Sequence, residues 1–325
     1  MRGFGSLAVI GLKCWFGTAA TMARTTVFIT GATDGIGRHT ARMFVRERLD
    51  GRKASEERKE ENTKGELLLL IHGRDESRLR ATKEELLSLA GKESNIEGVL
   101  QVETLCAELS CMGEVRRLAE EVKRKADDQL TVFIQNAGVF MPERAFSSEG
   151  LETTFAVNVA APFLLLSLLM PLLTSSHHSR VLMVSSISQH DGGALDLNDL
   201  QLVKRGYSSY KTYGNSKLIM AMLAKEAAER VQQQQQQGEQ LRPLIYSCDP
   251  GTVNTKMLLA GWGRCGIEPQ QANDEFTLTR AFDASRHGKY FVGARERKAA
   301  EDVYNVEKRR LLWSALETIT GAKCL

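Results

Sequence analysis

The sequence predicts an α/β fold, a doubly wound and mostly parallel sheet, and three observations carry that prediction. Short apolar runs alternate with helix-forming stretches along the chain, the order that produces parallel strands with helices on both faces. Residues 67–71 are all apolar, as expected for a strand buried on both faces. The glycine-rich residues 30–37 lie between an expected strand and an expected helix, where a tight turn is needed.

The expected strands are β-rich or apolar runs that end at turn residues, namely 26–29, 67–71, 99–102, 131–134, 181–184, 244–247 and 290–292. The expected helices are 37–48, 76–90 with Asp75 as N-cap, 112–125, 156–173 and 213–231. Two segments interrupt the alternation. We interpret the charged residues 50–65 as a solvated insertion and the glutamine run with Gly238, residues 232–238, as a surface loop.

Composition excludes several function classes. The 325 residues carry a formal net charge of +3 and are 26% charged and 42% hydrophobic, typical of a soluble protein with a buried core. Basic and acidic residues interleave, so the sequence gives no reason to expect nucleic acid as a partner. The six cysteines show no metal-ligand spacing. We therefore expect no metal and a reducing, cytoplasmic location.

The N-terminal residues 1–21 leave three interpretations open. The stretch contains no acidic residue, and Lys13 interrupts its apolar run, which is shorter than the roughly 20 residues that a membrane span needs. It is a weak membrane anchor, an organelle-targeting leader, or an extension that is not translated because synthesis starts at Met22. No shift in composition follows, so we expect residues 22–325 to form a single domain.

The motif Thr30-Gly31-Ala32-Thr33-Asp34-Gly35-Ile36-Gly37 has the chemistry of a phosphate-binding loop. Gly31 permits the tight turn, Gly35 lets the backbone approach a pyrophosphate, and Gly37 allows close packing of helix and strand. The helix that follows directs free N–H groups and its positive dipole end toward the phosphates.

A second motif is Tyr213-Gly214-Asn215-Ser216-Lys217. Residues four apart on a helix share one face, so the phenol and the ammonium can reach the same cleft. A cation next to the phenol favours the phenolate and lowers the tyrosine pKa from about 10. Tyr207 and Lys211 have the same spacing, so the spacing by itself is weak evidence.

Five motifs in order make the chain resemble the short-chain dehydrogenase/reductase family, in its branch of retinol dehydrogenases and broad-range carbonyl reductases. They are the glycine motif, Asn136-Ala137-Gly138, Val157-Asn158, Val184-Ser185-Ser186 with the Tyr213 motif, and Asp249-Pro250-Gly251-Thr252-Val253-Asn254-Thr255. The resemblance covers about residues 24–321 and implies a Rossmann fold. It also favours Tyr213 over Tyr207.

The resemblance implies a role for each residue that matches a family motif. Tyr213 is the general acid and base, Lys217 lowers its pKa and binds the nicotinamide ribose, Ser186 positions the substrate oxygen, and Asn158 holds a water. The remaining residues implied to contact the cofactor come from the glycine loop and from the ends of the later strands, namely Gly31, Thr33, Asp34, Gly35, Ile36, Gly37, Glu108, Asn136, Ala137, Gly138, Pro250, Gly251 and Val253. Glu108 departs from the family, which usually has aspartate there.

The second strand indicates which nicotinamide cofactor is used. An acidic residue at its end favours NAD, whereas nearby arginine accommodates the 2′-phosphate of NADP. By the resemblance, Gly73 takes the acidic position and Arg74 follows it, and Arg38 after the glycine loop is a second cation. Asp75 is better suited to capping a helix. We therefore expect NADP(H), with NAD(H) as the second choice.

The expected function is that of an oxidoreductase acting on a small to medium hydrophobic carbonyl or alcohol. The apolar Met257, Leu258, Leu259 and Trp262 are expected to cover the substrate. The alternative is a nicotinamide-binding regulatory or scaffold protein without turnover. The sequence leaves open a homodimer, and membrane attachment through residues 1–21 is the less favoured interpretation.

Overall fold

The computed structural model describes residues 24–57, 65–91, 99–176, 178–204, 206–236, 243–323 and 325. Its central element is an eight-stranded sheet in the order β3-β2-β1-β4-β5-β6-β7-β8, parallel except for the β7–β8 pair. The strands are β1 Thr25–Ile29, β2 Leu67–Gly73, β3 Leu100–Cys106, β4 Val132–Gln135, β5 Arg180–Val184, β6 Leu244–Asp249, β7 Tyr290–Val292 and β8 Arg295–Arg297. The predicted fold class and the seven predicted strands are confirmed.

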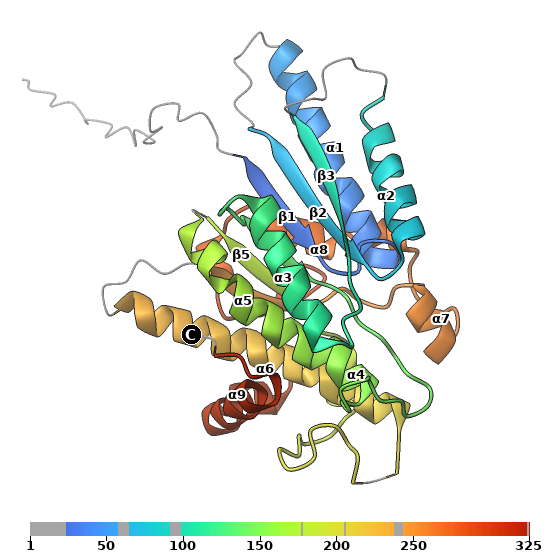
Figure 1. Cartoon of the computed structure of the whole chain (residues 1–325), viewed down its shortest axis with the longest axis vertical. Helices are drawn as coiled ribbons and strands as arrows, with labels where there is room; N and C mark the ends of the chain where they lie inside the picture. Colours follow the sequence, from blue (N-terminus) through green and yellow to red (C-terminus); the bar gives the residue numbers. More distant parts are fainter. Residues whose placement is uncertain are drawn as a thin grey trace, which may run out of the picture.

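Helices cover both faces of this sheet (Figure 1). They are α1 Gly35–Glu57, α2 Glu76–Ser88, α3 Met112–Ala126, α4 Thr153–Phe155, α5 Ala161–Ser175, α6 Ser209–Gln236, α7 Lys256–Trp262, α8 Asp274–Thr279 and α9 Val306–Thr320. Buried side chains of α1, α2 and α8 form one core with the sheet, and those of α3, α5, α6 and α9 form the other. This arrangement follows from strands that are buried on both faces.

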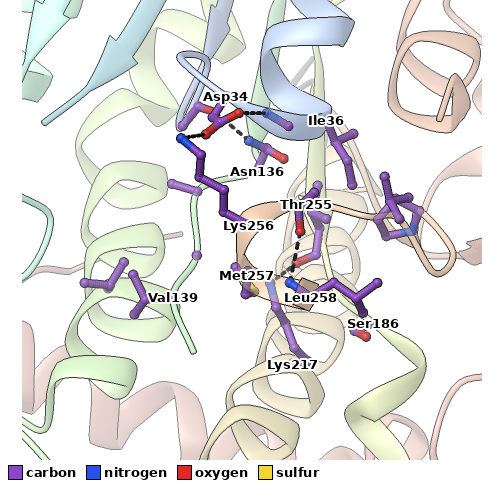
Figure 2. Close-up of a pocket in the computed structure, with 18 of the residues that line it drawn as sticks. Asp34, Ile36, Asn136, Val139, Ser186, Lys217, Thr255, Lys256, Met257 and Leu258 are labelled. Carbon is purple, nitrogen blue, oxygen red and sulfur yellow. Dashed lines mark hydrogen bonds and ion pairs between the residues drawn. The ribbon is translucent and has the colours of Figure 1, made fainter. Parts of the chain in front are cut away.

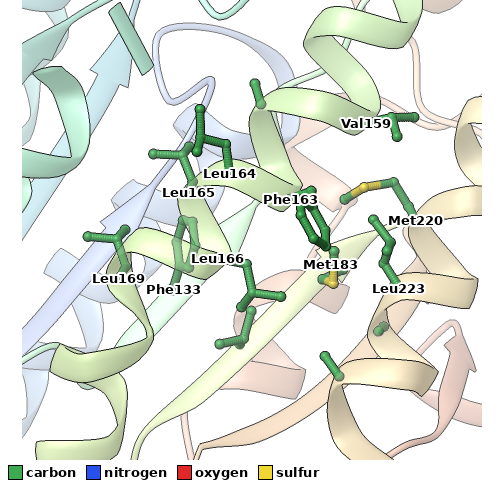
Figure 3. Close-up of a cluster of buried hydrophobic side chains, with 14 of the residues drawn as sticks. Phe133, Val159, Phe163, Leu164, Leu165, Leu166, Leu169, Met183, Met220 and Leu223 are labelled. Carbon is green, nitrogen blue, oxygen red and sulfur yellow. The ribbon is translucent and has the colours of Figure 1, made fainter. Parts of the chain in front are cut away.

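The larger core surrounds α5, which is apolar on nearly every side. Phe163, Leu166 and Leu169 of this helix pack with Phe133 of β4 and Met183 of β5 (Figure 3). Among the described residues, the continuous helical run Thr153–Ser175 is long and apolar enough to cross a membrane, but 83% of its most apolar window is buried inside the fold. A helix that is hydrophobic all round is expected in such a core.

The C-terminal helix α9 covers the side of α6 that faces away from the sheet (Figure 1). Arg309 is 1% exposed, and its Nε donates to Glu226 of α6 over 3.2 Å. Arg230 of α6 stacks its guanidinium on Trp313 of α9, 4.6 Å from the ring centroid. Because a buried cation must be paired, these contacts fix α9 against α6.

Two segment predictions were wrong. The charged insertion was expected to begin at Asp50, but α1 continues through Glu57. The glutamine run was expected to be a loop, but α6 continues through Gln236, because glutamine is a good helix former. The rest of both segments and the N-terminal residues 1–23 lie outside the described residues.

Candidate active site

A cavity of about 530 Å³ opens at the carboxyl ends of β1, β4, β5 and β6. Strand order reverses between β1 and β4, and ligands of open α/β sheets bind at such a switch point. Of the residues predicted to act in catalysis or to contact the cofactor, all except Gly37, Arg38 and Asn158 line the cavity. The structure therefore brings the glycine loop together with Ser186, Tyr213 and Lys217 in one site (Figure 2).

The glycine loop is held between β1 and β4 by short contacts. Gly31 and Gly35 have φ of +69° and +52°, a conformation that favours glycine. Asn136 Nδ2 donates to the carbonyls of Thr30 and Gly31 over 2.8 and 3.1 Å. A Cβ at Gly37 would lie 2.6 Å from the Gly31 oxygen and would also strike Asn136. Gly37 therefore does not line the cavity, but its lack of a side chain allows the loop to pack against Asn136.

His72 of β2 supports the same loop and was not predicted. The residue is 3% exposed, its Nδ1 accepts the Gly31 N–H over 3.3 Å, and its Nε2 lies 3.1 Å from the Ala107 oxygen. These partners require a neutral ring that carries its proton on Nε2. Burial lowers the pKa of His72 to about 4.

Charged side chains surround the cavity where β2 and β3 end. Arg74 lines it and lies 3.9 Å from Glu108, and Asp75 caps α2 by accepting the Arg78 N–H, as predicted. Arg38 lies elsewhere, because its Nε donates to Glu85 of α2 over 2.7 Å. Arg38 therefore does not line the cavity in this structure, and its role as the second cation stays a prediction. Arg78, in the first turn of α2, does line the cavity.

Tyr213 and Ser186 meet at the opposite end of the cavity. Both side chains line the cavity, and Tyr213 is 8% exposed. Burial raises the pKa of Tyr213, the Ser186 hydrogen bond opposes this increase, and the nearby charge of Asp249 adds to it. The sequence analysis expected Lys217 to lower the pKa of Tyr213, but burial has the largest effect and raises it. Ser186 also accepts the Ser188 N–H over 3.2 Å and so begins a short 3₁₀ turn.

Lys217 is buried beside Tyr213. Its Nζ lies 5.6 Å from the Tyr213 ring centroid and donates to the Val184 carbonyl over 3.0 Å. Burial lowers its pKa to about 8. Tyr207, which has the same spacing to Lys211, lies outside the cavity lining and donates to the Met141 carbonyl over 2.8 Å. The geometry thus distinguishes the two tyrosines.

Asn158 lies in a π-helical turn, Ala156–Ala160, directly before α5, and such turns are frequent at functional sites. Its side chain accepts the Val139 N–H over 2.8 Å and donates to the Val139 carbonyl over 2.9 Å. The amide also donates to Ser216 over 3.0 Å. Asn158 therefore couples the segment after β4 to the helix that carries Tyr213 and Lys217.

The segment after β6 closes the site. Pro250, Gly251 and Val253 line the cavity, and Asp249 accepts the Gly251 N–H over 2.9 Å. Asp249 thereby holds the turn that begins at Pro250. The sequence analysis did not give Asp249 a role.

Aromatic side chains cover the ring of Tyr213. Phe140 lies 4.7 Å from Trp262 and 5.8 Å from Tyr213, ring centroid to centroid. Tyr210 completes the cluster and donates its hydroxyl proton to the Gly261 carbonyl over 2.7 Å. Met257, Leu258 and Trp262 line the cavity as expected, whereas Leu259 does not. Phe140 and Tyr210 were not predicted.

Glycines form a cradle around this cavity that suits a nicotinamide dinucleotide. Gly31, Gly35, Gly73, Gly138 and Gly251 all line it. A Cβ at Gly35 would lie 2.9 Å from Thr255, and one at Gly138 would lie 3.4 Å from the Lys217 ammonium. Added side chains would therefore narrow the cavity where backbone must approach a ligand.

Comparisons with known proteins agree with this geometry. The family model for short chain dehydrogenase matches residues 59–197. Polyprenol dehydrogenase of Mus musculus is 30% identical over 312 residues, 90% of this chain and 83% of that protein. Retinol dehydrogenase 13 of Homo sapiens is 26% identical over 312 residues, 93% of this chain and 86% of that protein.

Solved structures share the fold. A crystal structure from Mycobacterium paratuberculosis superposes with a TM-score of 0.66 at 23% identity, covering 93% of this chain and 95% of the other. A short-chain dehydrogenase from Sphingobium yanoikuyae in complex with NADPH has a TM-score of 0.59 at 18% identity, covering 89% and 95%. With the motifs gathered in one cavity and relatives along nearly its whole length, this chain belongs to the short-chain dehydrogenase/reductase family and resembles its retinol dehydrogenases.

Proposed function

We propose that the protein is an NADP(H)-dependent oxidoreductase that interconverts a hydrophobic carbonyl compound and its alcohol, with Tyr213 as general acid and base. One observation carries the proposal: a glycine cradle and the Ser186, Tyr213 and Lys217 side chains line the same cavity. The family membership supports oxidoreductase chemistry on alcohols and carbonyls. The relatives named for retinol and polyprenol support a hydrophobic alcohol as substrate.

When bound, the nicotinamide supplies or accepts the hydride. In carbonyl reduction, Ser186 donates a hydrogen bond to the substrate oxygen and Tyr213 transfers its hydroxyl proton to that oxygen. The raised pKa of Tyr213 keeps the phenol protonated for this step. The Lys217 ammonium then stabilises the phenolate that the transfer leaves behind. In alcohol oxidation the proton moves in the opposite direction.

The cofactor preference follows from the cations near the end of β2. Arg74 and Arg78 both line the cavity there, and a guanidinium binds a phosphate through paired charge-assisted hydrogen bonds. Gly73 occupies the position where an acidic residue would favour NAD. The NADPH complex of the Sphingobium yanoikuyae protein is consistent with this choice.

Tyr213→Phe tests the catalytic role. Turnover of a panel of aldehydes, ketones and alcohols, followed by nicotinamide absorbance, should fall at least 100-fold, within the range of general acid catalysis. Cofactor affinity should stay within about twofold, since the buried ring is kept. The matched control is Tyr207→Phe, which removes a hydroxyl outside the cavity and should keep most of the turnover.

The alternative, a cofactor-binding regulatory or scaffold protein, makes the opposite prediction. It requires nicotinamide binding by the wild type together with no turnover of any compound in the panel. A greater loss in Tyr207→Phe than in Tyr213→Phe would refute the assignment of the general acid. We also propose a single domain, since one continuous sheet runs through the described residues. A cytoplasmic location is proposed because the four described cysteines are free thiols.

A further inference from the structure

Asp34 of the glycine loop lies between two cations from two other elements. Its Oδ2 accepts from Arg78 of α2 over 2.7 Å and from Lys256 of α7 over 2.9 Å. Its Oδ1 accepts the Gly35 N–H over 2.8 Å, at the beginning of α1. Figure 2 shows the lysine reaching across the cavity to this carboxylate.

All three side chains line the cofactor cavity and are partly open to solvent. Asp34 and Arg78 are 42% and 43% exposed, and Lys256 is 78% exposed. Partial burial opposes ionisation of Asp34, but the hydrogen bonds from Lys256 and Gly35 hold its pKa below the usual value. The cluster therefore contains one anion and two cations.

The donors around Asp34 form a set that suits a phosphate group. A backbone N–H at the beginning of a long helix, a guanidinium and an ammonium converge on the two oxygens of one carboxylate. Phosphate oxygens are bound by the same three kinds of donor. A carboxylate at this position must compete with any phosphate that enters the loop.

We propose that Lys256 and Arg78 bind phosphate oxygens of the nicotinamide dinucleotide and that Asp34 competes with these phosphates for both cations. The proposal rests on the proposed function, because it assigns residues within the same cofactor site. It gives α7 a part in cofactor binding, since Lys256 is the first residue of the helix that carries the cavity-lining Met257, Leu258 and Trp262.

Substitutions of the two cations and of Asp34 test the proposal separately. Lys256→Gln and Arg78→Gln should each raise the Kd for NADPH about threefold to tenfold, as expected when one partly exposed charge-assisted contact is lost. Asp34→Asn keeps an acceptor for the Gly35 N–H and removes the charge, and it should lower the Kd by a similar factor. All Kd values are measured on the purified full chain by calorimetry, with NADPH and NADH as ligands.

The matched control is Arg264→Gln. Arg264 lies just after α7, is 69% exposed and pairs with Glu268, but it does not line the cavity. Its loss should leave both Kd values unchanged. A loss that is equal for NADPH and NADH assigns the cations to the pyrophosphate, and a larger loss for NADPH assigns them to the 2′-phosphate. Either result supports the proposal.

Three results separate the possible failures. Unchanged Kd values in both cation variants overturn phosphate binding by Lys256 and Arg78; the proposed oxidoreductase function then stands, with Arg74 as the remaining cation for the 2′-phosphate. An unchanged or higher Kd in Asp34→Asn overturns the competition. Absence of binding of either dinucleotide by the folded wild type refutes the proposed function itself. Thermal melting of every variant verifies that the chain is folded.

Discussion

Protonation of His72 should destabilise the protein and loosen its glycine loop. The ring lies between the Gly31 N–H and the Ala107 carbonyl, and a proton on Nδ1 would turn an acceptor toward Gly31 into a second donor. Burial lowers the pKa of this ring from 6.5 to about 4. The difference of about 2.5 pKa units corresponds to roughly 3 kcal/mol of unfolding free energy.

The sign of the effect follows from the order of the two pKa values. The folded pKa lies below the unfolded one, so the unfolded chain binds the proton first as the pH falls. The contribution of His72 is complete above pH 6.5 and is lost as the pH falls toward 4. Glu275 acts in the opposite direction, because burial raises its pKa from 4.5 to about 7. The pH dependence of the wild type therefore mixes the two groups.

A comparison with His72→Asn isolates the histidine. Asparagine can accept the Gly31 N–H and does not titrate, while Glu275 contributes equally to both proteins. Urea unfolding at pH 7.5 and pH 4 should show the stability difference between wild type and variant shrinking by about 3 kcal/mol at the lower pH. A difference that does not change with pH would refute a buried neutral His72. The advantage of the wild type over His72→Asn in NADPH affinity should likewise shrink as the pH falls, because the neutral ring holds Gly31.

Two other predictions concern the cofactor site. Arg74→Ala should weaken binding of NADPH at least tenfold more than binding of NADH, because only NADPH carries the 2′-phosphate; equal losses or a wild-type preference for NADH would refute the preference for NADP(H). Gly37→Ala should lower the unfolding free energy by about 1–3 kcal/mol through overpacking against Gly31 and Asn136. The control Gly113→Ala, where an added Cβ meets nothing closer than 3.8 Å, should be neutral or stabilising in a helix.

The parts of the site that follow from sequence are those in which spacing determines position. The glycine loop, Asn136 and Pro250 directly follow strands, so their place at the carboxyl edge is fixed once the strands are recognised. The Tyr213–Lys217 pair depends only on the helical repeat. These residues converge in the cavity as expected.

The remaining site residues could not be predicted from the sequence, because their positions depend on which way a helix face points or on contacts between distant segments. Arg38 follows the glycine loop in sequence, but its helical position directs it to Glu85 of α2, and Arg78 reaches the cavity from another element. Phe140 and Tyr210 meet Trp262 from segments far apart in the chain. The expected lowering of the Tyr213 pKa weighed the cation and omitted burial, which dominates in the structure.

The π-helical turn at Asn158 makes this region far more sensitive to chain length than to side-chain identity. A π turn holds one residue more than the α-helix around it, so removing one residue other than Asn158 from Ala156–Ala160 would restore a regular helix. The helical turns on either side would keep nearly the same orientation, because the deleted residue is the one that the π turn accommodates, but the side chains within the turn would move. The amide of Asn158 would leave both backbone groups of Val139, and the site would lose its link to α6 although every catalytic side chain was still encoded.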